Sequence, residues 1–347
     1  GFFTYSWAYE QLTECDERAV SDAIAHHYGL PATHIPAEAA YPLSDYPGRA
    51  PSRDEPDVAA YAAAWERTMA EAQRQGVGTI LTGGRGDLAM GMDVFGYLDD
   101  LLMGRWLRLR RDLAEHSRWL GMPVRKVALA HMLRPLKIGL WPPNTAAPLR
   151  QALQRLIGRP VGFRPLPDWI DSTFAERIEL HRILEDRLPA EVRTGWPNRQ
   201  RGRLLFLPSV IRVDTAFERV SARFGLEAAD PWSDRRIVSF SAAVPQHVLN
   251  QPRERKRLVR RAMQDVVPSS VLPEMRKVSL MPLFQTALKE WARETVVQLT
   301  TESKAASCGF INQGKLRAYY EAYCRGEKEH VFFWYALTLE MWLSEHW

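Results

Sequence analysis

The sequence is poor in the residues from which disulfide frameworks and zinc sites are built. It has three cysteines in 347 residues, Cys15, Cys308 and Cys324, and they form no C-x-x-C pair. Its nine histidines show no H-E-x-x-H or other paired spacing of the kind that binds zinc. A small, odd number of cysteines argues against a disulfide framework and favours a reducing compartment, so we expect a cytoplasmic protein.

Long apolar runs and a signal peptide are also lacking. No stretch of the sequence approaches the roughly 20 apolar residues that a membrane-spanning helix needs, so we expect no membrane partner. Apolar residues make up 46% of the chain and charged residues 25%, which is ordinary for a globular protein. A chain of 347 residues has room for two domains or one large one.

The formal net charge is +5, and basic residues gather in the runs 104–112 and 252–263. Such runs are most often solvated helix faces. They would also suit an anionic ligand, such as a nucleotide, an acidic peptide or a nucleic acid. No paired zinc ligands or RNA-binding signature accompany them, so we do not expect nucleic acid as a partner.

The pattern of residues 1–96 alternates between strand and helix. Strands are expected at 1–7, 32–38 and 77–82, and helices at 13–28 and 57–75. Thr13 and Asp16 have the spacing of a capping box at the start of the first helix. This order predicts an α/β fold with a parallel sheet that binds ligands at the carboxyl ends of its strands.

From residue 97 to residue 347 the pattern is mainly helical, and we place a domain boundary between 96 and 97. Helices are expected at 97–119, 123–133, 146–157, 173–188, 203–224, 253–266, 283–300, 311–325 and 328–345.

The stretch ILTGGRGDLAMG, residues 80–91, follows the third predicted strand. Its glycines at 83, 84 and 86 would let the backbone approach a ligand closely, and Asp87 is a hard oxygen donor suited to Mg²⁺. The spacing matches neither the Walker A motif nor G-x-G-x-x-G, and a glycine-rich turn on its own most often only turns the chain.

Two further stretches make this loop more informative. The sequence reads T-G-x-x-G-D at 82–87, G-L-E-A-x-D-P-W at 225–232 and K-x-L-x-R-x-A at 256–262, with R-K at 276–277. In this order the three motifs resemble those of the synthetase domain of the asparagine synthetase family. The resemblance extends over nearly the whole chain, and its specificity lies in the order and spacing of the motifs.

The resemblance implies an α/β fold of the ATP-pyrophosphatase type and an ATP- and Mg²⁺-dependent ligase. In that family a carboxylate is activated as an acyl-adenylate, and an amine then forms the amide bond. By resemblance, Asp87 binds Mg²⁺, and Lys256 and Lys277 are the catalytic cations, with Lys277 facing the reacting centre. The implied nucleotide-binding residues are Thr82, Gly83, Gly84, Gly86, Asp87 and Lys256.

Each of these residues also has a purely structural interpretation. Asp87 could cap a helix after the turn, and Lys256 could face solvent within a basic run. For Asp234 we favour the structural role, which is to cap the next helix and pair with the arginines that follow it. Glu227 is interpreted as an ion-pair partner that shapes the pocket.

The sequence departs from the family pattern in two ways. The pyrophosphate-binding loop S-G-G-x-D-S is absent from the sequence, and we expect it upstream in the intact protein unless the chain is a degenerate homologue. Position 84 is glycine, where asparagine synthetases carry a glutamate that can act as base toward the amine.

The segment ECDER at 14–18 and the arginine-rich middle of the chain look most like lasso-peptide macrolactam cyclases, so we lean to a peptide cyclase. Its partners would be a carboxylate, either aspartate or a peptide side chain, and a precursor peptide or leader-binding protein. The alternatives are a glutamine-hydrolysing asparagine synthetase, a non-catalytic scaffold that binds a peptide or partner protein through its basic helices, and a nucleic-acid-modifying ligase.

Overall fold

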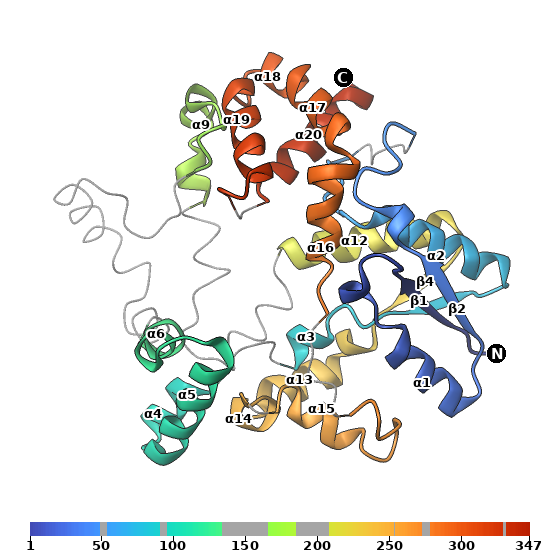
Figure 1. The fold of residues 1–347 in the computed structure, drawn as a ribbon, viewed down its shortest axis with the longest axis vertical. Helices are drawn as coiled ribbons and strands as arrows, with labels where there is room; N and C mark the ends of the chain where they lie inside the picture. The colour runs from blue at the N-terminus through green and yellow to red at the C-terminus, as the bar shows by residue number, and fades with distance from the viewer. Residues whose placement is uncertain are drawn as a thin grey trace.

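The computed structural model describes residues 1–48, 54–90, 96–133, 166–184, 208–252, 254–272, 278–328 and 331–347 (Figure 1). It has an α/β fold with small parallel sheets and many helices, as the sequence predicted. Lys277 and the helix expected at 146–157 lie outside the described residues.

The first sheet pairs β1 (Thr4–Ala8) with β2 (Ala32–Pro36) in parallel, with Thr4 opposite Ala32. Parallel neighbours need a crossover connection, and α1 (Arg18–Tyr28) provides it. Two of the strands expected in the first 96 residues are therefore paired as the alternating pattern indicated.

The predicted capping box at Thr13 is wrong. Thr13 lies in a short 3₁₀ turn, and α1 begins at Arg18. The carboxylate of Asp16 accepts hydrogen bonds from the backbone N–H groups of Arg18, at 2.7 Å, and of Tyr9, at 3.0 Å. Asp16 therefore ties the start of α1 to the end of β1, a longer-range contact that the local spacing did not indicate.

The second sheet joins segments that are distant in the sequence. β3 (Thr79–Leu81) pairs in parallel with β4 (Glu227–Ala229), and Thr79 lies opposite Glu227. This sheet spans the predicted boundary at 96/97, which itself stays a prediction. Its pairing brings the glycine-rich stretch and the G-L-E-A motif to the same edge.

Two helices cover this sheet. α2 (Ala62–Arg74) packs against α12 (Pro208–Arg223), and their shared cluster includes the buried side chains of Met69, Val220 and Leu226. The apolar residues of α2 recur at helical spacing, which is why one face of this helix is buried.

The rest of the described chain is mainly helical. Its helices are α3 (Gly86–Ala89), α4 (Tyr97–Leu102), α5 (Trp106–Leu120), α6 (Val124–Ala128), α9 (Ser172–Arg177), α13 (Arg235–Ala243), α14 (Gln246–Leu249), α15 (Arg257–Ala262), α16 (Met281–Thr286), α17 (Arg293–Thr301), α18 (Lys304–Ser307), α19 (Gln313–Cys324) and α20 (Phe333–His346).

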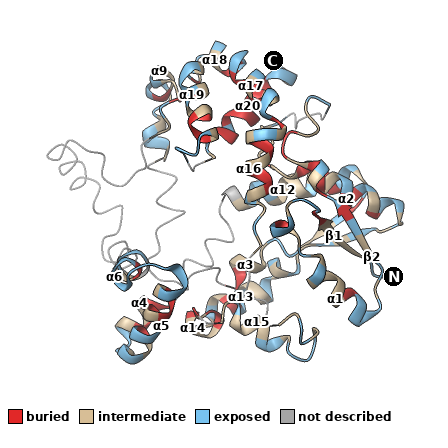
Figure 2. Ribbon diagram, in the orientation of Figure 1, coloured by how far each residue is buried: buried red, intermediate tan, exposed pale blue. Residues whose placement is uncertain are grey.

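The largest hydrophobic cluster lies among α17, α18, α19 and α20, where buried residues are concentrated (Figure 2). Tyr320 and Phe333 are fully buried there, with their ring centroids 5.6 Å apart, and the Tyr320 hydroxyl donates to the carbonyl of Leu288 at 2.7 Å. Among the described helices, none has the length and apolar character needed to cross a membrane.

Candidate active site at the carboxyl ends of β3 and β4

The glycine-rich loop begins where β3 ends. The Thr82 N–H donates to the Ala229 carbonyl at 2.9 Å, and the Gly86 N–H donates to the Gly83 carbonyl at 3.0 Å to close the turn. The chain then enters α3, with Asp87 in its first turn. The loop thus lies at the carboxyl end of a parallel strand, where α/β proteins commonly bind their ligands.

Asp230, directly after β4, holds this loop in place. One of its carboxylate oxygens accepts from the Arg85 N–H at 2.9 Å, and the other accepts from the Trp232 N–H at 3.0 Å. The Arg85 side chain is paired in turn with Asp214 of α12, at 2.7 Å from its Nε atom. One carboxylate therefore joins the first and second sequence motifs.

Gly86 is packed against an aromatic ring. A Cβ atom at this position would lie 3.1 Å from Nε1 and 3.2 Å from Cε2 of Trp232, closer than side chains normally approach. At Gly83, by contrast, an added Cβ would meet no heavy atom within 4 Å. Gly86 is thus required for packing, whereas the backbone at Gly83 lies open to a ligand.

The first and third motifs also meet. The Lys256 ammonium lies 2.6 Å from Oδ1 of Asp87, and the two side chains are 53% and 39% exposed. A partly exposed ion pair of this kind adds little stability, typically about 0–1 kcal/mol. The charged groups of Asp87 and Lys256 therefore meet at a surface that a ligand can reach.

The backbone at Lys256 is held in an unusual conformation. Its φ of 54° lies in the left-handed region, which is uncommon for residues other than glycine. The side chain of Asn250, itself buried, accepts a hydrogen bond from the Lys256 N–H at 3.1 Å. Lys256 stands at the start of α15, so this conformation sets the direction in which the helix leaves.

The structure thus gathers most of the residues predicted for the site. Thr82, Gly83, Gly84, Gly86 and Asp87 form or follow the loop, and Lys256, directly before α15, contacts Asp87. Their roles stay predictions, and Lys277 lies outside the described residues.

The structural role favoured for Asp234 is confirmed. Its side chain caps α13 by accepting from the Arg236 N–H at 2.7 Å, and it also pairs with the Arg236 guanidinium at 2.9 Å. The side-chain hydrogen bond from Arg236 is the main cause that lowers the pKa of Asp234 to about 2. Glu227 lies exposed on β4 and accepts a hydrogen bond of 3.4 Å from the Thr79 hydroxyl.

A cavity of about 370 Å³ opens beside the loop. This size falls within the range of small-molecule sites, about 300–1,000 Å³. Trp65 and Phe217, with ring centroids 5.0 Å apart, form an aromatic part of its wall. The other lining residues are Thr82, Gly84, Arg85, Val213, Asp214, Glu218, Ala228, Ala229, Asp230 and Ser233.

Sequence reasoning missed the contribution of α12 to this cavity. Asp214, Phe217 and Glu218 stand in a helix with no recognisable motif, so nothing in the sequence marked them. Residues 214, 217 and 218 have helical spacing and therefore lie on one face of α12. This spacing is the available signal in the sequence, but it does not distinguish the wall of a cavity from a helix face buried in the core.

The described residues of the site suit Mg²⁺ only where a bound ligand supplies further oxygen atoms to the ion. Within the described ranges, no three His, Cys, Asp or Glu side chains come together to hold a metal. Mg²⁺ is commonly bound by one or two carboxylates, completed by waters and substrate phosphates. The Asp87 carboxylate would supply one such ligand, and phosphate oxygens would supply others.

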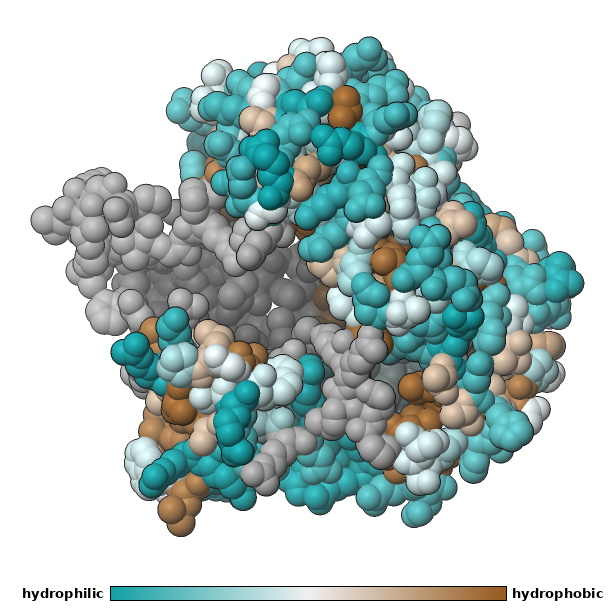
Figure 3. Space-filling model, viewed as in Figure 1, coloured by the Kyte–Doolittle hydropathy of each residue, from teal (hydrophilic) through white to brown (hydrophobic). Residues whose placement is uncertain are grey.

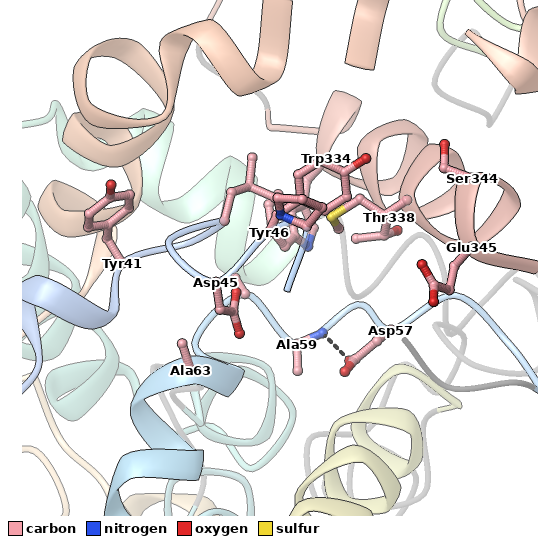
Figure 4. A pocket seen from close by; sticks show the side chains of 14 residues that line it. Tyr41, Asp45, Tyr46, Asp57, Ala59, Ala63, Trp334, Thr338, Ser344 and Glu345 are labelled. Atoms are coloured by element: carbon pink, nitrogen blue, oxygen red, sulfur yellow. Dashed lines mark hydrogen bonds between the residues drawn. The ribbon is translucent and has the colours of Figure 1, made fainter. Parts of the chain in front are cut away.

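A second cavity, of about 210 Å³, lies elsewhere in the molecule (Figure 4). Asp45 and Asp57 reach it from the segment between β2 and α2, and Trp334 and Glu345 reach it from α20. Its lining contains none of the residues predicted for the site, whereas Thr82 and Gly84 line the cavity beside the glycine-rich loop.

Comparison with known proteins agrees with the motifs. The sequence model of the family described as asparagine synthase matches residues 2–344, almost the entire chain. No curated protein matches the sequence.

Proposed function

The chain belongs to the asparagine synthase family of ATP-dependent, amide-forming ligases, and we propose that it activates a carboxylate of a peptide and joins it to an amine of the same peptide. The observation that carries this proposal is the contact between Asp87 and Lys256, at 2.6 Å. Two motifs far apart in the sequence place opposite charges together beside an open glycine-rich loop.

The chemistry requires charge to be neutralised at phosphate. A carboxylate oxygen attacks the α-phosphorus of ATP, the bond to the β-phosphate oxygen breaks, and pyrophosphate leaves. Mg²⁺ bound to the phosphates would neutralise part of the developing charge. The Lys256 ammonium would lie against a phosphate oxygen, and the Asp87 carboxylate would hold the metal. Lys277 is proposed as a second cation at the reacting centre.

The amine then attacks the acyl carbon, loses its proton, and AMP leaves. The cavity beside the loop suits the approach of an amine. Its lining carries three carboxylates, Asp214, Glu218 and Asp230, against the single guanidinium of Arg85. This surplus of negative charge attracts an ammonium group.

Gly84 supports a peptide substrate over free ammonia. It lines the cavity and offers no carboxylate to act as base at this position. The cavity, of about 370 Å³ with an aromatic wall, has room for part of a peptide. A glutamine-hydrolysing asparagine synthetase is the second candidate, since the family match alone supports it equally.

Pyrophosphate release by the full-length protein tests the ligase. We expect release that depends on ATP, Mg²⁺ and a carboxylate substrate, and we expect Asp87→Asn and Lys256→Gln each to lower the rate about 100-fold, the typical effect of removing one group that stabilises transition-state charge. Asp234→Asn is the matched control, because this aspartate caps α13 and does not line the cavity beside the loop. Unchanged rates in both site variants would contradict the assignment.

The substrate is tested separately. Peptides encoded beside the gene should lose one water on incubation with ATP, as seen by mass spectrometry, while aspartate with glutamine or ammonia should give no asparagine. Asparagine formation would favour the synthetase. Absence of ATP turnover with every carboxylate would favour the non-catalytic scaffold.

A further inference from the structure

The corner between α4 and α5 exposes a group of large apolar side chains. Leu102 is 52% exposed, Met103 63%, Trp106 61% and Leu107 87%. They are nearly consecutive in the chain, so they form one patch, which we call the apolar corner. Figure 3 shows strongly hydrophobic residues at the outer margin of the molecule over α4 and α5.

This exposure is not needed to build the core of these helices. α4, α5 and α6 pack around a separate cluster of Tyr97, Leu109, Leu113 and Val127, all of them buried. The residues of the apolar corner lie outside that cluster. They also line neither of the two cavities described above.

The charges of α4, α5 and α6 are segregated by burial. The carboxylates of Asp100, Asp112 and Glu115 are buried, and Arg105 and Arg108 approach Asp100 at 3.6 Å and 3.8 Å. The exposed charged residues of α5 and α6 are all basic: Arg110, Arg111, Arg118, Arg125 and Lys126. Folding therefore converts a segment of mixed charge into a cationic surface.

We propose that the apolar corner docks the protein on an anionic membrane surface. A projecting group of Trp, Leu and Met flanked by arginines matches the composition of interfacial elements, whose apolar side chains enter the bilayer boundary while basic side chains meet acidic headgroups. The described helices do not span a membrane, so contact is at the surface. This inference goes beyond the proposed function and departs from the expectation of no membrane partner.

The surroundings favour a lipid surface over a protein partner. A peptide is usually held in a groove or along a sheet edge. The corner instead presents side chains outward from a helix junction, where Gly104 turns the chain with a φ of 68°. Anionic lipid would supply an apolar phase for the four side chains and negatively charged headgroups for the exposed arginines.

Flotation of the full-length protein with vesicles tests the proposal. Vesicles of phosphatidylcholine with 30 mol% phosphatidylglycerol should carry at least ten times more protein than vesicles of phosphatidylcholine alone at low ionic strength. Raising the salt to about 0.5 M should reduce the bound fraction, since the attraction is partly electrostatic. The double variant Trp106→Ser/Leu107→Ser should lower binding at least tenfold.

Tyr335→Ser is the matched control, because Tyr335 is a large side chain of α20 that is 55% exposed. Circular dichroism establishes that each variant is folded. Equal binding to both kinds of vesicle, or unaltered binding by the double variant, would overturn the proposal. So would a dimer in light scattering that the double variant abolishes, which would assign the corner to a second copy of this chain. None of these readouts depends on ATP, so the result is independent of the ligase assignment.

Discussion

At the scale of single residues, Gly86 and Gly83 show how alike two positions can look in a sequence. Both are glycines of the same loop, and from the sequence both were interpreted as places where the backbone approaches a phosphate. The structure separates them, because the ring of Trp232 lies against Gly86, whereas a Cβ added at Gly83 would meet no heavy atom of the described residues within 4 Å. One glycine makes room for a side chain of the protein, and the other leaves room for a ligand.

Replacing Gly86 with alanine should therefore destabilise the protein by about 1–2 kcal/mol, the usual range for overpacking. The added Cβ would lie 3.1 Å from the Trp232 ring, which would have to move. Gly83→Ala should change the free energy of unfolding by less than about 0.5 kcal/mol. Urea denaturation of the two variants measures the difference. Equal free energies of unfolding would show that the Trp232 ring moves away without loss of stability.

Lys256 shows how much of the site could be predicted from single residues. Its identity as a candidate came from motif order, and a lysine within a basic run is more often a solvated side chain. Its contact with Asp87 depends on the left-handed backbone at Lys256 and on the buried side chain of Asn250. Neither feature has a local sequence signature.

At the scale of helices and strands, local signals predicted which elements exist better than where they begin. Helices occupy most of the expected stretches in the described part of the chain, but the single helix expected at 97–119 is divided into α4 and α5 by a turn at Gly104. The short helices α14 and α18 were not expected. The start of α1 was misplaced, because Asp16 binds the backbone at the end of β1 as well as that of Arg18. At α13 the local signal was right, since Asp234 and Arg236 are close in sequence and no distant residue competes.

The cap of α13 should make stability depend on acid pH. The pKa of Asp234 is lowered from 3.8 to about 2 mainly by its hydrogen bond from Arg236, so its ionised form is favoured in the folded state. This contribution is complete above the unfolded pKa and is lost as the pH falls from about 4 toward 2.

Asp234→Asn keeps a capping acceptor and removes the charge. The melting temperature of the variant should lie below that of the wild type at pH 6, and the difference should shrink between pH 4 and pH 2. Calorimetry at a series of pH values measures it. A difference that stays constant down to pH 2 would show that the charge of Asp234 has no part in stability.

At the scale of the whole molecule, the C-terminal helices depend on one buried carboxylate. Glu340 of α20 is buried and accepts from the Ser303 hydroxyl at 2.8 Å and from the Ala305 N–H at 3.0 Å, while the Lys304 N–H donates to its other oxygen. These donors belong to the start of α18, so Glu340 joins two helices across the largest core.

Glu340→Ala should lower the free energy of unfolding by about 3 kcal/mol, because buried donors at the start of α18 would lose their acceptor. Glu302→Ala, at an exposed glutamate just after α17, should change it by less than about 0.5 kcal/mol. Urea unfolding followed by tryptophan fluorescence measures both. A small decrease in the free energy of unfolding of Glu340→Ala would mean that water replaces the carboxylate as acceptor and that α18 does not depend on Glu340.

The sequence by itself determined the alternation of strands and helices, the glycine-rich loop after β3 and the family, because these depend on neighbours in the chain or on the order of motifs. The tertiary structure decided that β3 pairs with β4, that Asp87 meets Lys256, and that α12 lines the cavity. It also decided that the acidic side chains of α4 and α5 are largely buried while the apolar ones at the junction of the two helices are exposed. Those outcomes depend on contacts between residues far apart in the chain, whose free energies are set by packing and burial and leave no local pattern.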